Sequence, residues 1–149
     1  MTEASEEARQ PLCSRQRLNS IIEDLSGKRV VQLGLGLMGG GEGAVRFLAE
    51  RGARVLVTDR KSAEQLAPAL ERLDDLDLEL RLGEHRSEDL LAADLVVANT
   101  AVPRKASLLE RCRQEDVPLT SPMNLFLSLC PAPITAVTGS TGKSTTTAM

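Results

Sequence analysis

Short apolar runs alternate with amphipathic segments along most of this chain. The apolar runs are rich in Val, Leu and Ile and end close to Gly, Asp or Asn, which is typical of buried strands. The segments between them place apolar residues at helical spacing. We expect strands at 28–34, 53–59, 77–83, 94–99, 117–121 and 132–139, and helices at 18–27, 40–52, 62–76, 87–94, 106–116 and 123–129.

This alternation of strand and helix predicts the fold class. Parallel strands joined by right-handed helical crossovers form a doubly wound, Rossmann-like α/β sheet. Two local signals refine the helices. Pro68 should kink or shorten the helix at 62–76, because proline lacks the N–H that an interior helical position needs. Ser87 is the expected N-cap of the helix at 87–94.

The stretch Cys130–Pro133 is the natural domain boundary. We expect a flexible leader at 1–20 and one Rossmann-like domain at 21–130. The remainder, 131–149, should be the first strand and phosphate loop of a second, truncated domain.

Composition limits the possible functions. Among 149 residues only two are aromatic, which disfavours the stacking platforms that bind single-stranded nucleic acid. The net charge of −3 provides no basic field for nucleic acid or anionic lipid, and no apolar run approaches the length of a membrane span. Three cysteines at unrelated spacings indicate reduced thiols, so we expect a cytoplasmic protein. From the charge and the apolar pattern we expect neither nucleic-acid nor membrane partners.

The first chemical motif is G-x-G-x-x-G, formed by Gly34, Gly36 and Gly39 between a strand and a helix. Such glycines permit a tight turn, close approach of a diphosphate to the backbone, and close packing of helix on strand. Asp59 lies twenty residues after Gly39, at the end of the next strand, where a carboxylate can bind a ribose or a base. The motif fits NAD, but any nucleoside diphosphate fits it equally well.

Three further glycines, Gly40, Gly41 and Gly43, should weaken the first turn of the following helix. Either this helix begins late, or something large approaches it. His85, the single histidine, follows the third expected strand, and we favour a loop role at the sheet edge over catalysis.

The second motif is "TGSTGKST" after a strand-like run near the end of the chain. Its backbone N–H groups can cradle phosphates, Lys143 can reach the β- and γ-phosphates, and the Ser144 hydroxyl can bind Mg²⁺. The strict P-loop pattern would require glycine at Val137, so that pattern is not met.

Together the two motifs make the chain resemble the Mur ligase family, ATP-dependent amide-bond-forming enzymes of peptidoglycan synthesis. The family's phosphate loop has the form T-G-x-x-G-K-[ST]-[ST], and its N-terminal domain is a Rossmann-like sheet that binds a UDP-sugar. The resemblance covers 27–149 and rests on "GKRVVQLGLGLMG", "RGARVLVTDRK", "LRLGEHRSEDLLAADLVVAN" and "ITAVTGSTGKSTTTAM". Within the family it is closest to the members that add D-glutamate to UDP-N-acetylmuramoyl-L-alanine.

The resemblance implies a role for each motif residue. The UDP-sugar would lie along Gly34, Leu35, Gly36, Leu37 and Met38, with Asp59 and Arg60 on the uracil or ribose side. Lys143 and Ser144 would be catalytic, Ser144 also holding the metal, in a loop that binds ATP through Gly139, Ser140, Thr141, Gly142, Lys143, Ser144 and Thr145. Family members phosphorylate the substrate carboxylate, and the amine of D-glutamate then attacks the acyl phosphate.

Some positions depart from the family pattern. Asn99 begins the triplet that stands where Ser-Pro-Gly is common, Thr141 replaces a frequent asparagine, and Asn124 replaces a carboxylate. The family's catalytic and amino-acid-binding domains would lie beyond Met149. We therefore expect a fragment that does not catalyse ligation by itself, and we also expect it to be a monomer.

Three alternatives stay open. A sister ligase of the same family would add a different residue. An NAD-dependent oxidoreductase domain would use Asp59 for the ribose, but it leaves the second motif unexplained. A non-catalytic nucleotide-binding module would account for the missing domains.

Overall fold

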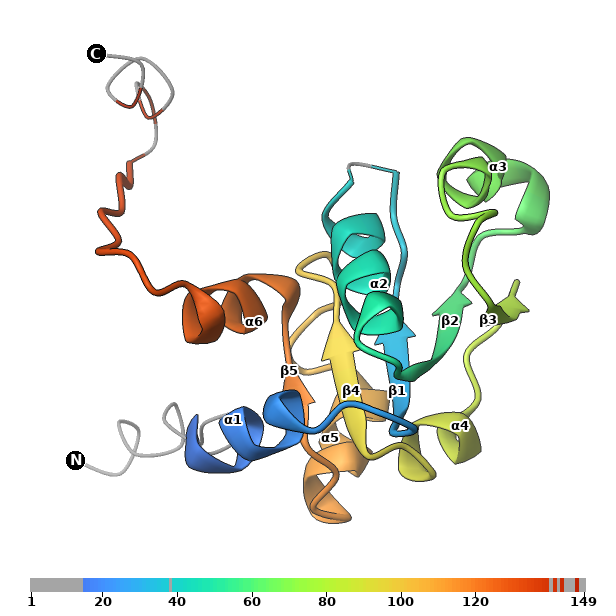
Figure 1. Cartoon of the computed structure of the whole chain (residues 1–149). Helices are drawn as coiled ribbons and strands as arrows, with labels where there is room; N and C mark the ends of the chain where they lie inside the picture. Colours follow the sequence, from blue (N-terminus) through green and yellow to red (C-terminus); the bar gives the residue numbers. More distant parts are fainter. Residues whose placement is uncertain (1–14, 38, 140, 142, 144–146, 148–149) are drawn as a thin grey trace, which may run out of the picture.

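Five parallel strands form one sheet in the computed structural model, which describes residues 15–37, 39–139, 141, 143 and 147. Their order is β3-β2-β1-β4-β5 (Figure 1). This arrangement confirms the doubly wound fold class. The strands are β1 (Arg29–Leu33), β2 (Arg54–Asp59), β3 (Leu78–Leu82), β4 (Leu95–Ala98) and β5 (Leu119–Thr120).

Helices cover both faces of the sheet. One hydrophobic core joins the sheet to α1 (Arg15–Glu23), α2 (Gly40–Glu50), α6 (Pro122–Leu129) and the end of α3 (Ala63–Glu71). A second core joins the other face to α4 (Ser87–Leu91) and α5 (Ser107–Gln114). Along β1, Val30 belongs to the first core and Val31 to the second, because successive strand side chains point to opposite faces.

The order of the strands creates a crevice beside β1. This central strand pairs with β2 on one side and with β4 on the other. The connection from β1 runs through α2 on one face, whereas the connection from β4 runs through α5 on the opposite face. The loops after β1 and β4 therefore diverge, and in open α/β sheets ligands bind at this point.

The helix ends show how local sequence and packing compete. At α3 the expected helix is shortened to Ala63–Glu71, begins with a capping box between Ser62 and Gln65, and holds Pro68 inside. At α4 our N-cap prediction was wrong: Arg86 is the N-cap residue and makes no side-chain cap hydrogen bond, while Ser87 is already helical.

The N-terminal helix starts earlier than we expected. Leu18, inside the segment predicted as a leader, is only 5% exposed and packs in the first core with Ile22. Transfer of apolar side chains out of water is favourable, so this helix packs against the sheet. The division of the chain into domains stays a prediction.

The predicted sixth strand at 132–139 is absent. Residues 131–139 are exposed and have no regular structure, and Figure 1 shows the chain leaving the sheet domain after α6. A strand needs a neighbour for its backbone N–H and C=O groups, and the described residues offer none there. Among the helices of the described ranges, none is long and apolar enough to cross a membrane.

Candidate functional site

A cleft of about 950 Å³ opens at the carboxyl end of the sheet. Its lining comes from the segments that follow β1, β2, β3 and β4, together with the start of α5. It therefore occupies the crevice beside β1 that the strand order creates. The lining residues are Leu33, Gly34, Leu35, Gly36, Leu37, Gly40, Asp59, Arg60, Lys61, His85, Asn99, Thr100, Ala101, Val102, Pro103, Ala106, Ser107 and Leu108.

The glycine loop after β1 (residues 34–39) lines one side of this cleft through residues 34–37. Gly34 and Gly36 have φ angles of +81° and +68°, in the left-handed region that favours glycine. A Cβ at either position would lie 3.3 Å from the side chain of Asn99. Glycine is thus required both for the turn and for the close approach of Asn99.

Close packing between the loop and α2 depends on Gly41. A Cβ there would lie 2.1 Å from the carbonyl oxygen of Leu35. We expected Gly39 to permit this packing, but that was wrong, because a Cβ at Gly39 would meet nothing within 4 Å. Glycine is favoured at position 39 because its φ angle is +81°. The helix does not begin late, because α2 starts at Gly40. The backbone of the glycine loop itself, at Leu35, is what approaches the helix closely.

Asp59 ties the end of β2 to the glycine loop. Its Oδ2 accepts hydrogen bonds from the backbone N–H groups of Leu35 (2.9 Å) and Gly36 (3.2 Å), and its Oδ1 accepts one from Lys61 N–H (2.9 Å). Burial alone would raise the pKa of Asp59, but the N–H donors of Lys61, Gly36 and Leu35 and the Lys61 charge outweigh it and lower this pKa. The carboxylate is therefore ionised and holds the loop in shape.

Asn99 holds the same loop from the β4 side. Its Nδ2 donates to the carbonyl oxygen of Leu35 (3.3 Å), and its Oδ1 accepts from the backbone N–H of Ala101 (3.2 Å). The backbone around Leu35 is thus held on one side by Asp59 and on the other by Asn99. Such a loop is preorganised, so little conformational entropy is lost when a ligand binds.

The N-terminus of α2 is the part of the cleft best suited to an anion. Among the described residues no side chain caps this helix, so its first N–H groups and the positive end of its dipole are available to a ligand. Arg60 and Lys61 add two cationic side chains to the cleft lining. Because Asp59 already occupies the N–H groups of Leu35 and Gly36, an anion would bind farther along, toward Leu37 and α2.

Most substrate residues expected from sequence come together here. Gly34, Leu35, Gly36, Leu37, Asp59 and Arg60 all line the cleft, and Met38 lies outside the described residues. The sequence motifs did not point to Lys61, and they indicated no ligand contact for His85 or Asn99. The available signal was position: each follows the carboxyl end of a strand, where the fold gathers ligand contacts.

The described residues of the second motif do not line the cleft. Ser140, Gly142, Ser144 and Thr145 lie outside the described residues. Gly139, Thr141 and Lys143 are described, are exposed and do not line the cleft. The ammonium of Lys143 donates to the carbonyl oxygen of Gly139 over 2.6 Å. The expected roles of this loop stay predictions.

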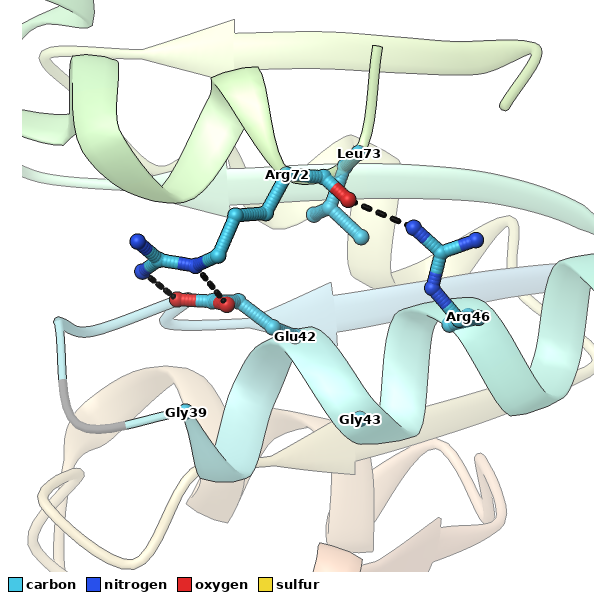
Figure 2. A pocket seen from close by; sticks show the side chains of 6 residues that line it. All are labelled: Gly39, Glu42, Gly43, Arg46, Arg72 and Leu73. Atoms are coloured by element: carbon cyan, nitrogen blue, oxygen red, sulfur yellow. Dashed lines mark hydrogen bonds and ion pairs between the residues drawn. The ribbon is translucent and has the colours of Figure 1, made fainter. Parts of the chain in front are cut away.

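A second depression, of about 420 Å³, lies between α2 and the end of α3 (Figure 2). The Arg72 guanidinium bridges both carboxylate oxygens of Glu42, and Arg46 donates to the Arg72 carbonyl oxygen. The pKa of Glu42 is lowered chiefly by the hydrogen bond from Arg72. Since these charged groups already pair with one another, the depression is a helix contact, and the cleft is the better candidate site.

Comparison with known proteins shows the family to which this chain belongs. A family model described as "Mur ligase MurD-like, N-terminal domain" matches residues 28–121, which span β1 to β5. UDP-N-acetylmuramoylalanine--D-glutamate ligase from Roseiflexus sp. (strain RS-1) is 45% identical over 123 residues, covering 83% of this chain and 26% of the relative. The ligase of the same name from Treponema pallidum (strain Nichols) is 43% identical over 124 residues, covering 82% and 23%.

The chain thus spans about a quarter of the length of these curated relatives. Among solved structures, glutamyl-tRNA reductase from Methanopyrus kandleri has a TM-score of 0.48 at 22% identity, over 80% of this chain and 37% of that one. That likeness is too distant to bear on function. The family match covers the whole sheet and the glycine loop, and on this basis the chain belongs to the Mur ligase family, within its MurD-like N-terminal domains.

Proposed function

We propose that this chain is the N-terminal, UDP-sugar-binding part of a ligase that adds D-glutamate to UDP-N-acetylmuramoyl-L-alanine in peptidoglycan synthesis. The observation that carries the proposal is the cleft of about 950 Å³, onto which the glycine loop opens beside the uncapped N-terminus of α2. The substrate and the amino acid are those in the names of the relatives. The whole reaction belongs to a protein of the relatives' full length.

The diphosphate and the nucleoside of the UDP-sugar each have a chemically matched surface in the cleft. The diphosphate suits the N-terminus of α2 and the cationic side chains of Arg60 and Lys61. Asp59 suits the nucleoside, because a carboxylate has about four acceptor positions and the described residues use three of them. The free acceptor position is on Oδ1, which receives a single N–H.

We further propose that Gly139–Thr145 would hold ATP and Mg²⁺. The donor set fits these groups: backbone N–H groups and the Lys143 ammonium suit phosphates, and the Ser144 hydroxyl suits Mg²⁺. Bound ATP would supply the phosphoryl group that activates the substrate carboxylate for attack by D-glutamate. The part played by Lys143 is to neutralise phosphate charge, for which its flexible ammonium is suited.

We infer that the protein works in the cytoplasm, as a monomer. Among the described cysteines, Cys112 and Cys130 are free thiols, as a reducing compartment favours. The ligands proposed here are small molecules, and the net charge of −3 offers no attraction to nucleic acid.

Calorimetric titration of this chain with UDP-N-acetylmuramoyl-L-alanine tests the proposal, with NAD titrated in parallel. Gly36→Ala is the diagnostic variant, because its Cβ would crowd Asn99 and strain the loop. Gly27→Ala is the matched control: Gly27 also has a positive φ, but it lies outside the cleft and its Cβ would meet nothing within 4 Å.

Binding of the UDP-sugar that is weakened by Gly36→Ala and unchanged by Gly27→Ala is the expected result. Binding of NAD without binding of the UDP-sugar would reject the proposal and favour an oxidoreductase domain. If the two substitutions changed the affinity for the UDP-sugar equally, the glycine loop would have no specific role in binding it.

A further inference from the structure

Thr58 is a fully buried residue at the end of β2, and it fixes the chemistry of His85. Its Oγ1 lies 3.0 Å from the carbonyl oxygen of Glu84 and 2.9 Å from Nδ1 of His85. The carbonyl can only accept a hydrogen bond, so the single hydroxyl proton of Thr58 goes to Glu84. His85 must then be the donor in its own contact with Thr58.

The direction of these two hydrogen bonds determines the tautomer of neutral His85. The ring proton resides on Nδ1, which donates to Thr58 Oγ1, and Nε2 carries a lone pair. Within the described residues Nε2 has no hydrogen-bond partner. The buried side-chain atoms of these residues that lack a partner are those of Arg29, Gln32 and Thr120, so Nε2 is not a buried atom. Nε2 is therefore open to solvent, on a residue that lines the cleft.

The surroundings keep His85 neutral near pH 7. Burial lowers its pKa most, the positive charge of Arg60 lowers it further, and Asp59 opposes them in part. The two charged residues beside His85 in sequence, Glu84 and Arg86, pair with each other over 2.6 Å. The cleft thus contains an uncharged acceptor close to the cation Arg60.

The strand order indicates which part of a ligand His85 would meet. The glycine loop follows β1, Asp59 ends β2, and His85 follows β3, which is the outer strand on that side. A ligand whose diphosphate lies at α2 and whose nucleoside reaches Asp59 continues toward His85. A nucleoside offers hydroxyl and imide N–H donors, whereas a diphosphate offers acceptors only.

We propose that His85 is a specificity-determining residue, whose Nε2 accepts a hydrogen bond from an O–H or N–H of the nucleoside half of the bound nucleotide sugar. This proposal rests on the function proposed above. It assigns His85 a contact that neither the family match nor the relatives' names supply. The opposite arrangement, with His85 facing the diphosphate, would make the protonated ring the favoured form.

The experiment is a calorimetric titration of tag-free protein with UDP-N-acetylmuramoyl-L-alanine at pH 7.5 and 5.0. The diphosphate of this ligand is esterified at both ends, so it has no phosphate proton that titrates near pH 6. His85→Gln retains an acceptor oxygen that does not titrate. His85→Phe retains a ring but has no acceptor.

We expect the affinity of the wild-type protein to be lower at pH 5.0 than at pH 7.5, because a protonated Nε2 can no longer accept a hydrogen bond. His85→Phe should bind about tenfold more weakly at pH 7.5, and His85→Gln should bind independently of pH. Unchanged affinity in His85→Phe, or tighter wild-type binding at pH 5.0, overturns this proposal alone. Absence of wild-type binding at both pH values overturns the proposed function and this proposal with it.

A second measurement needs no ligand. His85 is the only histidine in the sequence, so ¹⁵N spectra of the imidazole contain a single ring. We expect the Nδ1–H tautomer at pH 7.5, and a shift toward Nε2–H in Thr58→Val, which removes the acceptor of Nδ1. A wild-type protein in the Nε2–H form would overturn the proposal, because Nε2 would then be a donor.

Discussion

The carboxylate of Asp59 accepts a hydrogen bond from the backbone N–H of Leu35 over 2.9 Å, and so ties the end of β2 to the glycine loop. The acid that sequence patterns assign to a nucleoside therefore also shapes the loop that would bind the diphosphate. One side chain links the two halves of the site, so a change at Asp59 should affect both stability and binding.

Replacing Asp59 by Asn tests this dual role. The amide can accept on only one side, and its NH₂ group would face a backbone donor inside a site where Asp59 is 8% exposed. We expect a loss of about 1–3 kcal/mol in the free energy of unfolding, measured by urea denaturation. Asp75→Asn is the control, because Asp75 pairs with Arg46 at the surface and should change stability far less. Equal effects would contradict the loop-holding role.

The pH dependence of the free energy of unfolding should reveal the ionised carboxylate of Asp59. The pKa of Asp59 is lowered in the folded protein, so its contribution is fully present above the unfolded value of about 3.9. As the pH falls below that value and through the folded pKa, this contribution is lost. The difference in unfolding free energy between wild type and Asp59→Asn should be constant from pH 7 to 5 and shrink below about pH 4. A constant difference down to pH 2 would argue against an ionised Asp59.

Two glycines of one helix should respond in opposite directions to alanine. At Gly41 the new Cβ would lie 2.1 Å from the Leu35 carbonyl oxygen, so the helix or loop must move, and we expect a loss of about 1–3 kcal/mol. At Gly43 a Cβ meets nothing within 4 Å, and Gly43→Ala should stabilise the helix by up to about 1 kcal/mol. Thermal unfolding of the two variants provides the measurement. Stabilisation by Gly41→Ala would show that α2 does not pack on the loop as described.

The two described cysteines should differ in reactivity. Cys112 is 1% exposed, and burial raises the pKa of its thiol, with Arg113 opposing. Cys130 is half-buried after α6. Because the thiolate is the reactive form, iodoacetamide at pH 8 should label Cys130 first, and Cys112 only in denaturant. Mass spectrometry of the digested protein identifies the labelled residue, and early labelling of Cys112 in buffer would contradict its place in the second core.

Much of this architecture was readable from local pattern. The five strands of the sheet lie within the ranges that apolar runs predicted, and the ends of α2 follow from Gly39 before it and Gly52 after it. Strand and helix periodicity are properties of neighbouring residues, so they survive in the sequence without knowledge of the fold. The glycine loop and Asp59 were found in the same way, because their spacing along one strand-helix-strand unit is fixed.

The sequence by itself therefore determined the order of elements, the parallel sheet and the glycine loop with its acid. Only the tertiary structure decided that Asp59 bonds the loop, that Gly41 rather than Gly39 permits close packing, and that His85 lines the cleft. It also decided that 132–139 forms no strand, since strand formation needs a partner that local sequence cannot supply. These outcomes depend on which distant segments become neighbours, and that is set by the packing of the whole sheet.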